Sequence, residues 1–210
     1  MIKILKRFFK YYRLRKIDVK LTFKSTKNLS FKGLKLGRQV NLIDVRSIGE
    51  NVSIGDYSYI NVDTMICSGN IGRFCSIGYD CIIGADEHPT EYLLTHPIIY
   101  DNSYNMITNK VKFIQENPPI IKDNVWIGAK TIIKRGVEIG EGCIIGANSF
   151  VNKDIPPYSI AAGSPVRIIK NRKETCNFKD INMEDVSTEE IINLLMEEDY
   201  SRNLGKVEIY

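Results

Sequence analysis

Aliphatic residues recur at every sixth position over most of this chain. An α-helix has no period of six, and an ordinary strand has a period of two. A six-residue period predicts a parallel β-helix, a solenoid that turns a corner once in each hexad. The lead residues of the hexads are Leu36, Leu42, Ile48, Ile54, Ile60 and Ile66, then, after a slip of one residue, Ile71, Ile77 and Ile83, and later Ile121, Ile127, Ile133, Ile139, Ile145 and Val151.

A second position in most hexads, four residues after the lead, holds a small or β-branched side chain suited to the narrow interior of a coil. These residues are Val52, Ser58, Thr64, Cys75, Cys81, Val125, Thr131, Val137, Cys143 and Ser149. Three hexads make one coil, so fifteen hexads predict five coils and a prism roughly 24 Å long at ordinary strand spacing. A single coil cannot bury its inner face, so neighbouring coils stabilise one another.

The repeat is interrupted once, over residues 85–119. A loop of this length inside a compact domain is uncommon, and it is either functional or disordered. The segment is rich in apolar residues, from Leu93 to Ile114, so we expect it to bury surface against another part of the assembly. It also contains both histidines of the protein, His88 and His96.

The net charge of +4 is unevenly distributed. Residues 1–20 carry a net charge of +7, whereas residues 172–210 carry −5. The basic front segment could form an amphipathic helix that contacts an anionic membrane surface or an acidic polysaccharide, or it could cap the open end of the solenoid. It lacks an aromatic and basic nucleic-acid platform, so we expect no nucleic-acid partner.

At the other end, Ser187 and Glu190 form a capping-box pattern ahead of an apolar run, which predicts a helix over residues 187–198 packed on the prism or on a neighbouring subunit. The predicted organisation is a cap segment at 1–30, the β-helix at 31–170 with its inserted loop, and a tail at 171–210.

Charges throughout the first twenty residues argue against a secretory signal, and the chain has no apolar run long enough to span a membrane, so we expect a cytoplasmic protein. The five cysteines form no C-x-x-C pair, and three of them occupy inward hexad positions. We therefore interpret them as structural thiols and expect no metal site.

Two motifs resemble a known family. Asn124-Val125-Trp126-Ile127-Gly128, followed by the run at 145–170, resembles the hexapeptide-repeat O-acetyltransferases that use acetyl-CoA. The loop sequence H-P-T-E-Y-L-L-T-H-P resembles the xenobiotic acetyltransferase branch, especially its relatives that acetylate capsular or other surface polysaccharide. The resemblance, which covers roughly 36–170, implies an all-β fold, a left-handed parallel β-helix with a long inserted loop and terminal helices, assembled as a homotrimer.

The resemblance also implies a mechanism. His88 would be the general base that deprotonates a sugar hydroxyl for direct attack on acetyl-CoA, since a histidine titrates near neutral pH. Asp86, Glu87 or Glu91 could orient its ring, and the sequence does not choose among them. His96 and Tyr92 are candidate acceptor-binding residues.

The cofactor implied is acetyl-CoA, bound along the prism. Its candidate contacts are Trp126, Ala129, Ala147, Asn152, Lys153 and Lys170. The alanines would offer backbone groups to the pantetheine arm, and the lysines would lie near the phosphates. Asn152 departs from the threonine often found at its position in this family.

Other functions remain open at this level. The same chemistry could serve an antibiotic acetyltransferase, acting on streptogramin or chloramphenicol, or a nucleotide-sugar N-acetyltransferase. A zinc enzyme of the carbonic-anhydrase type needs three histidines, and this chain has two. A β-helix can also serve as a noncatalytic scaffold.

Overall fold

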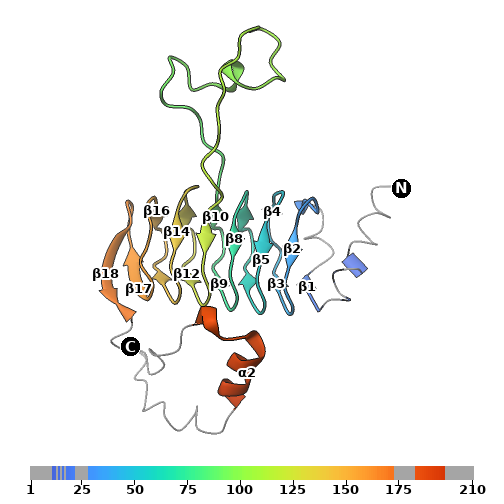
Figure 1. The fold of residues 1–210 in the computed structure, drawn as a ribbon, viewed down its shortest axis with the longest axis vertical. Coiled ribbons are helices and arrows are strands. Elements are labelled where there is room, and N and C mark those ends of the chain that lie inside the picture. Colours follow the sequence, from blue (N-terminus) through green and yellow to red (C-terminus); the bar gives the residue numbers. More distant parts are fainter. Residues whose placement is uncertain are drawn as a thin grey trace.

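The computed structural model describes residues 11, 12, 14, 16, 18–21, 28–172 and 183–196. Short strands, nearly all of two residues, stack in three sheets to form a triangular prism, with one long loop projecting from it (Figure 1). The strands pair in parallel except for the last two, which pair antiparallel. The predicted all-β fold, a left-handed parallel β-helix, is confirmed. Fifteen strands, β2 to β16, make five coils of three strands each, as the hexad count predicts.

Within the five coils, each sheet collects every third strand of the chain. We call them sheets A, B and C. Sheet A contains β1 (Lys20–Leu21), β3 (Asn41–Leu42), β6 (Tyr59–Ile60), β9 (Ser76–Ile77), β12 (Trp126–Ile127), β15 (Ile144–Ile145), β17 (Ser159–Ala162) and β18 (Arg167–Asn171). Sheet B contains β4 (Ser47–Ile48), β7 (Met65–Ile66), β10 (Ile82–Ile83), β13 (Ile132–Ile133) and β16 (Phe150–Val151). Sheet C contains β2 (Lys35–Leu36), β5 (Ser53–Ile54), β8 (Asn70–Ile71), β11 (Ile120–Ile121) and β14 (Glu138–Ile139).

The core is the column of hexad lead residues. Each lead is the second residue of its strand, and fourteen of the fifteen are buried, Leu36 in the first coil being partly exposed. All ten residues predicted at the second inward position are buried as well. Buried apolar area is the main favourable contribution to folding, so this column is the principal source of stability.

The coils approach so closely that some corners admit only glycine. A Cβ atom on Gly128 would lie 2.4 Å from the backbone nitrogen of Ala147 in the next coil. The slip between Ile66 and Ile71 falls at a corner shortened by one residue, where Gly69 has a φ of +153°. A residue with a side chain rarely adopts that backbone conformation, so glycine permits the tighter corner.

The C-terminal segment lies beside the prism and contains the 3-10 turn η4 (Met183–Asp185) and the helix α2 (Thr188–Met196) (Figure 1). The capping box predicted for this helix is present: the backbone N–H of Ser187 donates to the Glu190 carboxylate at 2.8 Å, and the backbone N–H of Glu190 donates to the Ser187 hydroxyl at 3.2 Å. Thr188 and Ile191 are buried. The end of the predicted helix, residues 197–198, lies outside the described residues.

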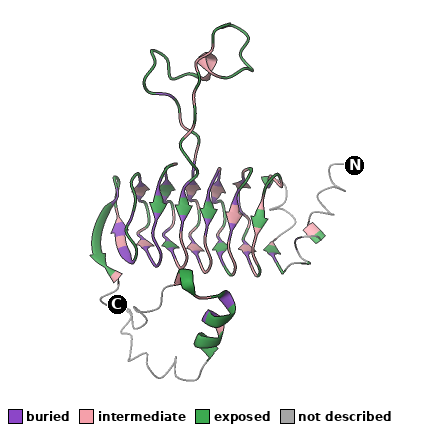
Figure 2. Cartoon of the chain, in the orientation of Figure 1, coloured by how far each residue is buried: buried purple, intermediate pink, exposed green. Residues whose placement is uncertain are grey.

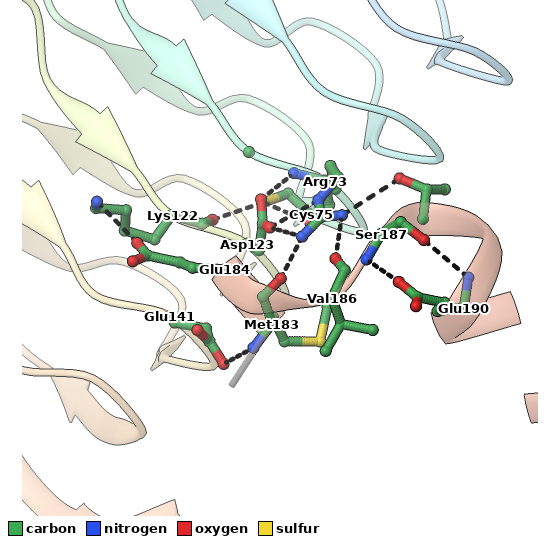
Figure 3. Close-up of polar contacts among 12 residues, drawn as sticks. Arg73, Cys75, Lys122, Asp123, Glu141, Met183, Glu184, Val186, Ser187 and Glu190 are labelled. Atoms are coloured by element: carbon green, nitrogen blue, oxygen red, sulfur yellow. Dashed lines mark hydrogen bonds and ion pairs between the residues drawn. The ribbon is translucent and has the colours of Figure 1, made fainter. Parts of the chain in front are cut away.

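Arg73 fastens this segment to the corner between sheets C and A (Figure 3). Its guanidinium donates to the carbonyl oxygens of Met183 and Val186 and forms an ion pair with Asp123. Lys122 pairs with Glu184 at 2.9 Å beside it. Polar contacts with consecutive coils therefore hold the segment against the prism.

Most of the basic segment 1–20 lies outside the described residues. Two of its described residues, Leu14 and Val19, are buried against the first coils, and β1 adds a parallel strand to the end of sheet A. Within the described part of the chain, no helix has the length and apolar character needed to cross a membrane.

Candidate active site

The inserted loop leaves the prism after β10 and returns at β11, and its two stems are joined near the base (Figure 1). Arg135 donates to the Glu116 carbonyl at 2.8 Å and lies 3.4 Å from the Asp86 carboxylate, so it contacts both stems. Glu87 and Gln115 exchange two hydrogen bonds of 2.9 Å across the stems. These contacts fix the base of the loop at the corner between sheets B and C.

His88 is the next residue after Glu87, at the base of the loop where the two stems are hydrogen-bonded. Its Nδ1 atom lies 2.9 Å from the hydroxyl of Tyr100, and the Tyr100 ring packs against Phe113 with ring centroids 5.1 Å apart. The His88 side chain is exposed, and within the described residues its Nε2 atom makes no hydrogen bond. The arrangement fixes one ring nitrogen and presents the other to solvent.

His96 is engaged differently. Its Nδ1 atom accepts a hydrogen bond from the backbone N–H of Ile98 at 3.1 Å, which caps the 3-10 helix η2 (Pro97–Ile99). The edge of its ring contacts Tyr104, with centroids 5.4 Å apart. His96 therefore organises the loop tip. Tyr92 lies on the same loop and is exposed.

The residues of the loop are mostly exposed or half-buried in the single chain (Figure 2), and its exposed residues include large apolar ones. Leu93 is fully exposed, and Met106 and Ile114 are exposed by 82% and 70%. Exposed apolar residues gathered on one segment are typical of a surface that another molecule covers.

The candidate cofactor contacts fall into two groups. Trp126, Ala129 and Ala147 lie on adjacent coils along sheet A and its corner with sheet B, where the backbone N–H of Asn148 donates to the Ala129 carbonyl at 2.9 Å. Trp126 is 54% exposed and flanks a shallow pocket of about 80 Å³. That pocket is lined by Phe74, Ser76, Asn124, Val125, Ile144 and Arg172 in addition to the indole.

The remaining contacts lie on the final coils. Asn152 and Lys153 follow β16 at the corner between sheets B and C, whereas Lys170 sits on β18 opposite Ile160. All three side chains are exposed. Within one prism, four of the six candidate residues therefore lie on sheet A or its corner with sheet B, and the other two lie at the corner between sheets B and C.

The sheet topology also separates the loop from Trp126. The loop begins at a strand of sheet B and ends at a strand of sheet C, whereas Trp126 is on sheet A, the third face. His88 and Trp126 of one chain thus originate on opposite sides of the prism.

Sequence reasoning missed Tyr100, the residue that contacts the candidate base. Nothing in its spacing distinguishes it from Tyr92 and Tyr104 on the same loop. The three acidic residues considered instead have other partners: Asp86 faces Arg135, Glu87 pairs with Lys134, and Glu91 accepts from the backbone of Thr90. In the described parts of the chain, no cluster of three or more His, Cys, Asp or Glu side chains is placed to hold a metal ion.

The chain is similar to known bacterial acetyltransferases. Residues 118–153 match the family model described as bacterial transferase hexapeptide (six repeats). A chloramphenicol acetyltransferase from Escherichia coli is 30% identical over 167 residues, which cover 68% of this chain and 74% of that protein. The galactoside O-acetyltransferase of Escherichia coli (strain K12) is 33% identical, over 66% of this chain and 64% of its own length.

Among solved structures, a hexapeptide-repeat acetyltransferase from Vibrio cholerae O1 biovar eltor, complexed with acetyl coenzyme A, superposes with a TM-score of 0.50. It is 26% identical, and the superposition covers 67% of this chain and 71% of that one.

Proposed function

Because this chain belongs to the hexapeptide-repeat acetyltransferases, which use acetyl-CoA, we propose that it transfers the acetyl group to a sugar hydroxyl of a capsular or other cell-surface polysaccharide. The observation that carries this proposal is the His88 ring, held at Nδ1 and open at Nε2. A cytoplasmic location accords with the use of acetyl-CoA.

His88 is the general base of the proposed reaction. Its Nε2 atom takes the proton of the acceptor hydroxyl as the oxygen attacks the thioester carbonyl directly. The tetrahedral intermediate then collapses, the C–S bond breaks, and the departing thiolate of coenzyme A receives the proton from the imidazolium. Backbone N–H groups stabilise the oxyanion of the intermediate.

Acetyl-CoA binds along the corner that carries Ala129 and Ala147, where backbone groups contact the amides of the pantetheine arm. Trp126 lies beside them and covers the thioester end, and Lys170, on the last strand of sheet A, lies toward the phosphates. Asn152 and Lys153 contact the phosphates from the neighbouring prism of the trimer. The basic charge of the two lysines is complementary to those phosphates. The acetyl coenzyme A in the Vibrio cholerae relative supports this choice of co-substrate.

The enzyme acts as a homotrimer in which one chain brings its loop to the prism of the next. The separation of His88 and Trp126 within one chain supports this arrangement, because a second prism is needed to bring a loop and a sheet A face together. Sheet B supplies a suitable contact surface, since its outward side chains are apolar on four neighbouring strands. They are Met65, Ile82, Ile132 and Phe150.

The acceptor is a sugar, and the loop forms its pocket through His96 and Tyr92. The galactoside O-acetyltransferase relative supports a sugar hydroxyl as the target. The basic segment at 1–20 favours an anionic or membrane-associated glycan.

A second candidate function is antibiotic acetylation, which the chloramphenicol acetyltransferase relative favours. The experiment that separates the two measures release of the coenzyme A thiol by the purified protein with acetyl-CoA and each of four acceptor types. These are surface oligosaccharides, nucleotide sugars, chloramphenicol and a streptogramin, with each product identified by mass spectrometry. We expect turnover with the oligosaccharides; turnover confined to a drug would replace the first proposal with the second.

A further inference from the structure

Tyr100 is the one described side chain that hydrogen-bonds the His88 imidazole, through Nδ1 at 2.9 Å. The carboxylates nearest in sequence are directed elsewhere. Glu87 forms an ion pair with Lys134 at 2.9 Å, and Asp86 lies 3.4 Å from Arg135. His88 is therefore oriented by a neutral hydroxyl, not by a carboxylate.

The position of Tyr100 is itself tightly determined. Its backbone N–H donates to the Pro97 carbonyl at 3.0 Å, and its ring lies against Phe113. The Lys110 ammonium group donates to the carbonyl oxygens of Ile98, Asp101 and Tyr104 at 3.2, 2.5 and 2.5 Å. An ammonium group has three donors, so Lys110 uses all of them to fix the backbone on both sides of Tyr100.

The chemistry of a general base then determines the direction of the hydrogen bond. A neutral imidazole carries one N–H proton, on either Nδ1 or Nε2. Nε2 can take the proton of the acceptor hydroxyl only if its lone pair is free, so the N–H proton of the neutral ring must be on Nδ1. The Nδ1–H group therefore donates to the Tyr100 oxygen. The tautomer of a histidine is usually set in this way, by the hydrogen bond that the other ring nitrogen makes.

We propose that Tyr100 is a positioning residue of the acetyl-transfer reaction, one that holds His88 in the Nδ1–H tautomer with Nε2 directed at the acceptor. This inference rests on the proposed role of His88 as general base. Tyr100 carries no charge, so it contributes orientation and tautomer choice without the electrostatic stabilisation that a carboxylate would give to the imidazolium.

The first test compares Tyr100→Phe with Tyr104→Phe. Each substitution removes the hydroxyl of a tyrosine in this loop, and each tyrosine contacts a histidine. Only Tyr100 forms a hydrogen bond with its histidine. We expect Tyr100→Phe to lower kcat about three- to tenfold, the range of one neutral hydrogen bond, with the KM for acetyl-CoA unchanged. Tyr104→Phe should leave both constants at the wild-type level. Equal effects of the two variants would overturn the proposal.

The second test is a double-mutant cycle with His88→Gln. If Tyr100 acts through His88, adding Tyr100→Phe to His88→Gln causes no further loss of kcat, whereas a general structural role would lower kcat by the same factor in both backgrounds. If His88→Gln alone retains wild-type activity, the base assignment fails. If His88→Gln is inactive and Tyr100→Phe matches Tyr104→Phe, only the Tyr100 proposal fails.

The third test observes the tautomer directly. Long-range proton–nitrogen correlation spectra of the imidazole rings distinguish protonation at Nδ1 from protonation at Nε2, and a His96→Gln variant assigns the two histidines. We expect His88 to carry its proton on Nδ1 in the wild-type protein and to lose that preference in Tyr100→Phe. A wild-type spectrum with the proton on Nε2 would overturn the proposal.

Discussion

The side chains of Arg73 and Asp123 form an ion pair at 2.6 Å although fifty positions separate them in the sequence (Figure 3). The same corner holds an equivalent pair one coil apart, Arg38 and Asp56 at 2.9 Å, separated by eighteen positions. The inserted loop accounts for the larger number of positions between Arg73 and Asp123. Coils on either side of that loop therefore stack as directly as coils with no insertion between them.

The role of His88 is tested by substitution to alanine. We expect kcat to fall about 10²- to 10⁴-fold, the usual contribution of a general base. The midpoint of thermal unfolding should not change, because the side chain is exposed. His96→Ala is the comparison: it removes the cap of η2 and should cause a smaller loss of activity. Full activity of His88→Ala would exclude the proposed base.

Burial in the prism is tested at two adjacent isoleucines of β11. Ile121 is 1% exposed and points inward, whereas Ile120 is 38% exposed and points outward. We expect Ile121→Ala to lower the free energy of unfolding by about 2–5 kcal/mol, the cost of removing a buried aliphatic side chain. Ile120→Ala should cost less than about 1 kcal/mol by the same measurement. Similar costs in urea denaturation would contradict the inward and outward assignment.

The proposed subunit contact through sheet B is tested with Ile132→Glu. Placing a carboxylate in an apolar interface carries a large desolvation cost, so we expect the trimer to dissociate. The matched control is Ile120→Glu, which puts the same charge at the same strand position on sheet C. Light scattering after size-exclusion chromatography gives the mass of each species. A trimer that survives Ile132→Glu but not Ile120→Glu would place the contact on the wrong sheet.

The attachment of α2 should depend on pH through the carboxylates that bind Arg38. A side-chain hydrogen bond from Arg38 lowers the pKa of Glu189 from its ordinary value of 4.5. Burial opposes the ionised form of Asp56, but hydrogen bonds from Arg38 outweigh it and the pKa is lowered from 3.8. A folded-state pKa below the unfolded value means that the stabilisation is complete above the unfolded value and is lost as the pH falls through the folded value.

We therefore expect residues 183–196 to remain docked at pH 7 and to loosen below about pH 4. Hydrogen exchange followed by mass spectrometry, corrected for the intrinsic effect of pH, measures this against the prism. An Arg38→Met variant should exchange faster in this segment already at pH 7. Exchange that is independent of pH in the wild-type protein would contradict the prediction.

The thiols should react in order of burial. Burial raises the pKa of the Cys75 thiol to about 12, and burial also raises the pKa of Cys81 and Cys143. Cys67 is partly exposed at the shortened corner. In a Cys176→Ser background at pH 8, we expect a disulfide reagent to modify Cys67 alone until the protein unfolds. Modification of all four thiols in the native protein would show that the prism opens readily.

The prism could be predicted from the sequence because its structure repeats. Each coil places the same side chain in the same environment, so Ile77 and Ile127 meet the same requirement as every other lead residue, and a one-dimensional pattern contains the necessary information. The capping box at Ser187 and Glu190 was predictable for a related reason, since both partners lie within one helical turn.

The loop could not be predicted in the same way. The contact between His88 and Tyr100 joins residues twelve positions apart in a segment with no repeat, and it depends on Lys110 and Phe113 to shape the backbone around it. Residue types were informative there, because both histidines marked the segment. Their partners followed from three-dimensional geometry alone.

The insertion between Gly84 and Ile120 lies at a single corner of the solenoid, between sheets B and C, and displaces no strand of it. Evolution, or a protein engineer, can therefore lengthen, shorten or exchange this segment while the surrounding repeats keep their register. The specificity for the acceptor can then change without an equal loss in the ability of the prism to fold.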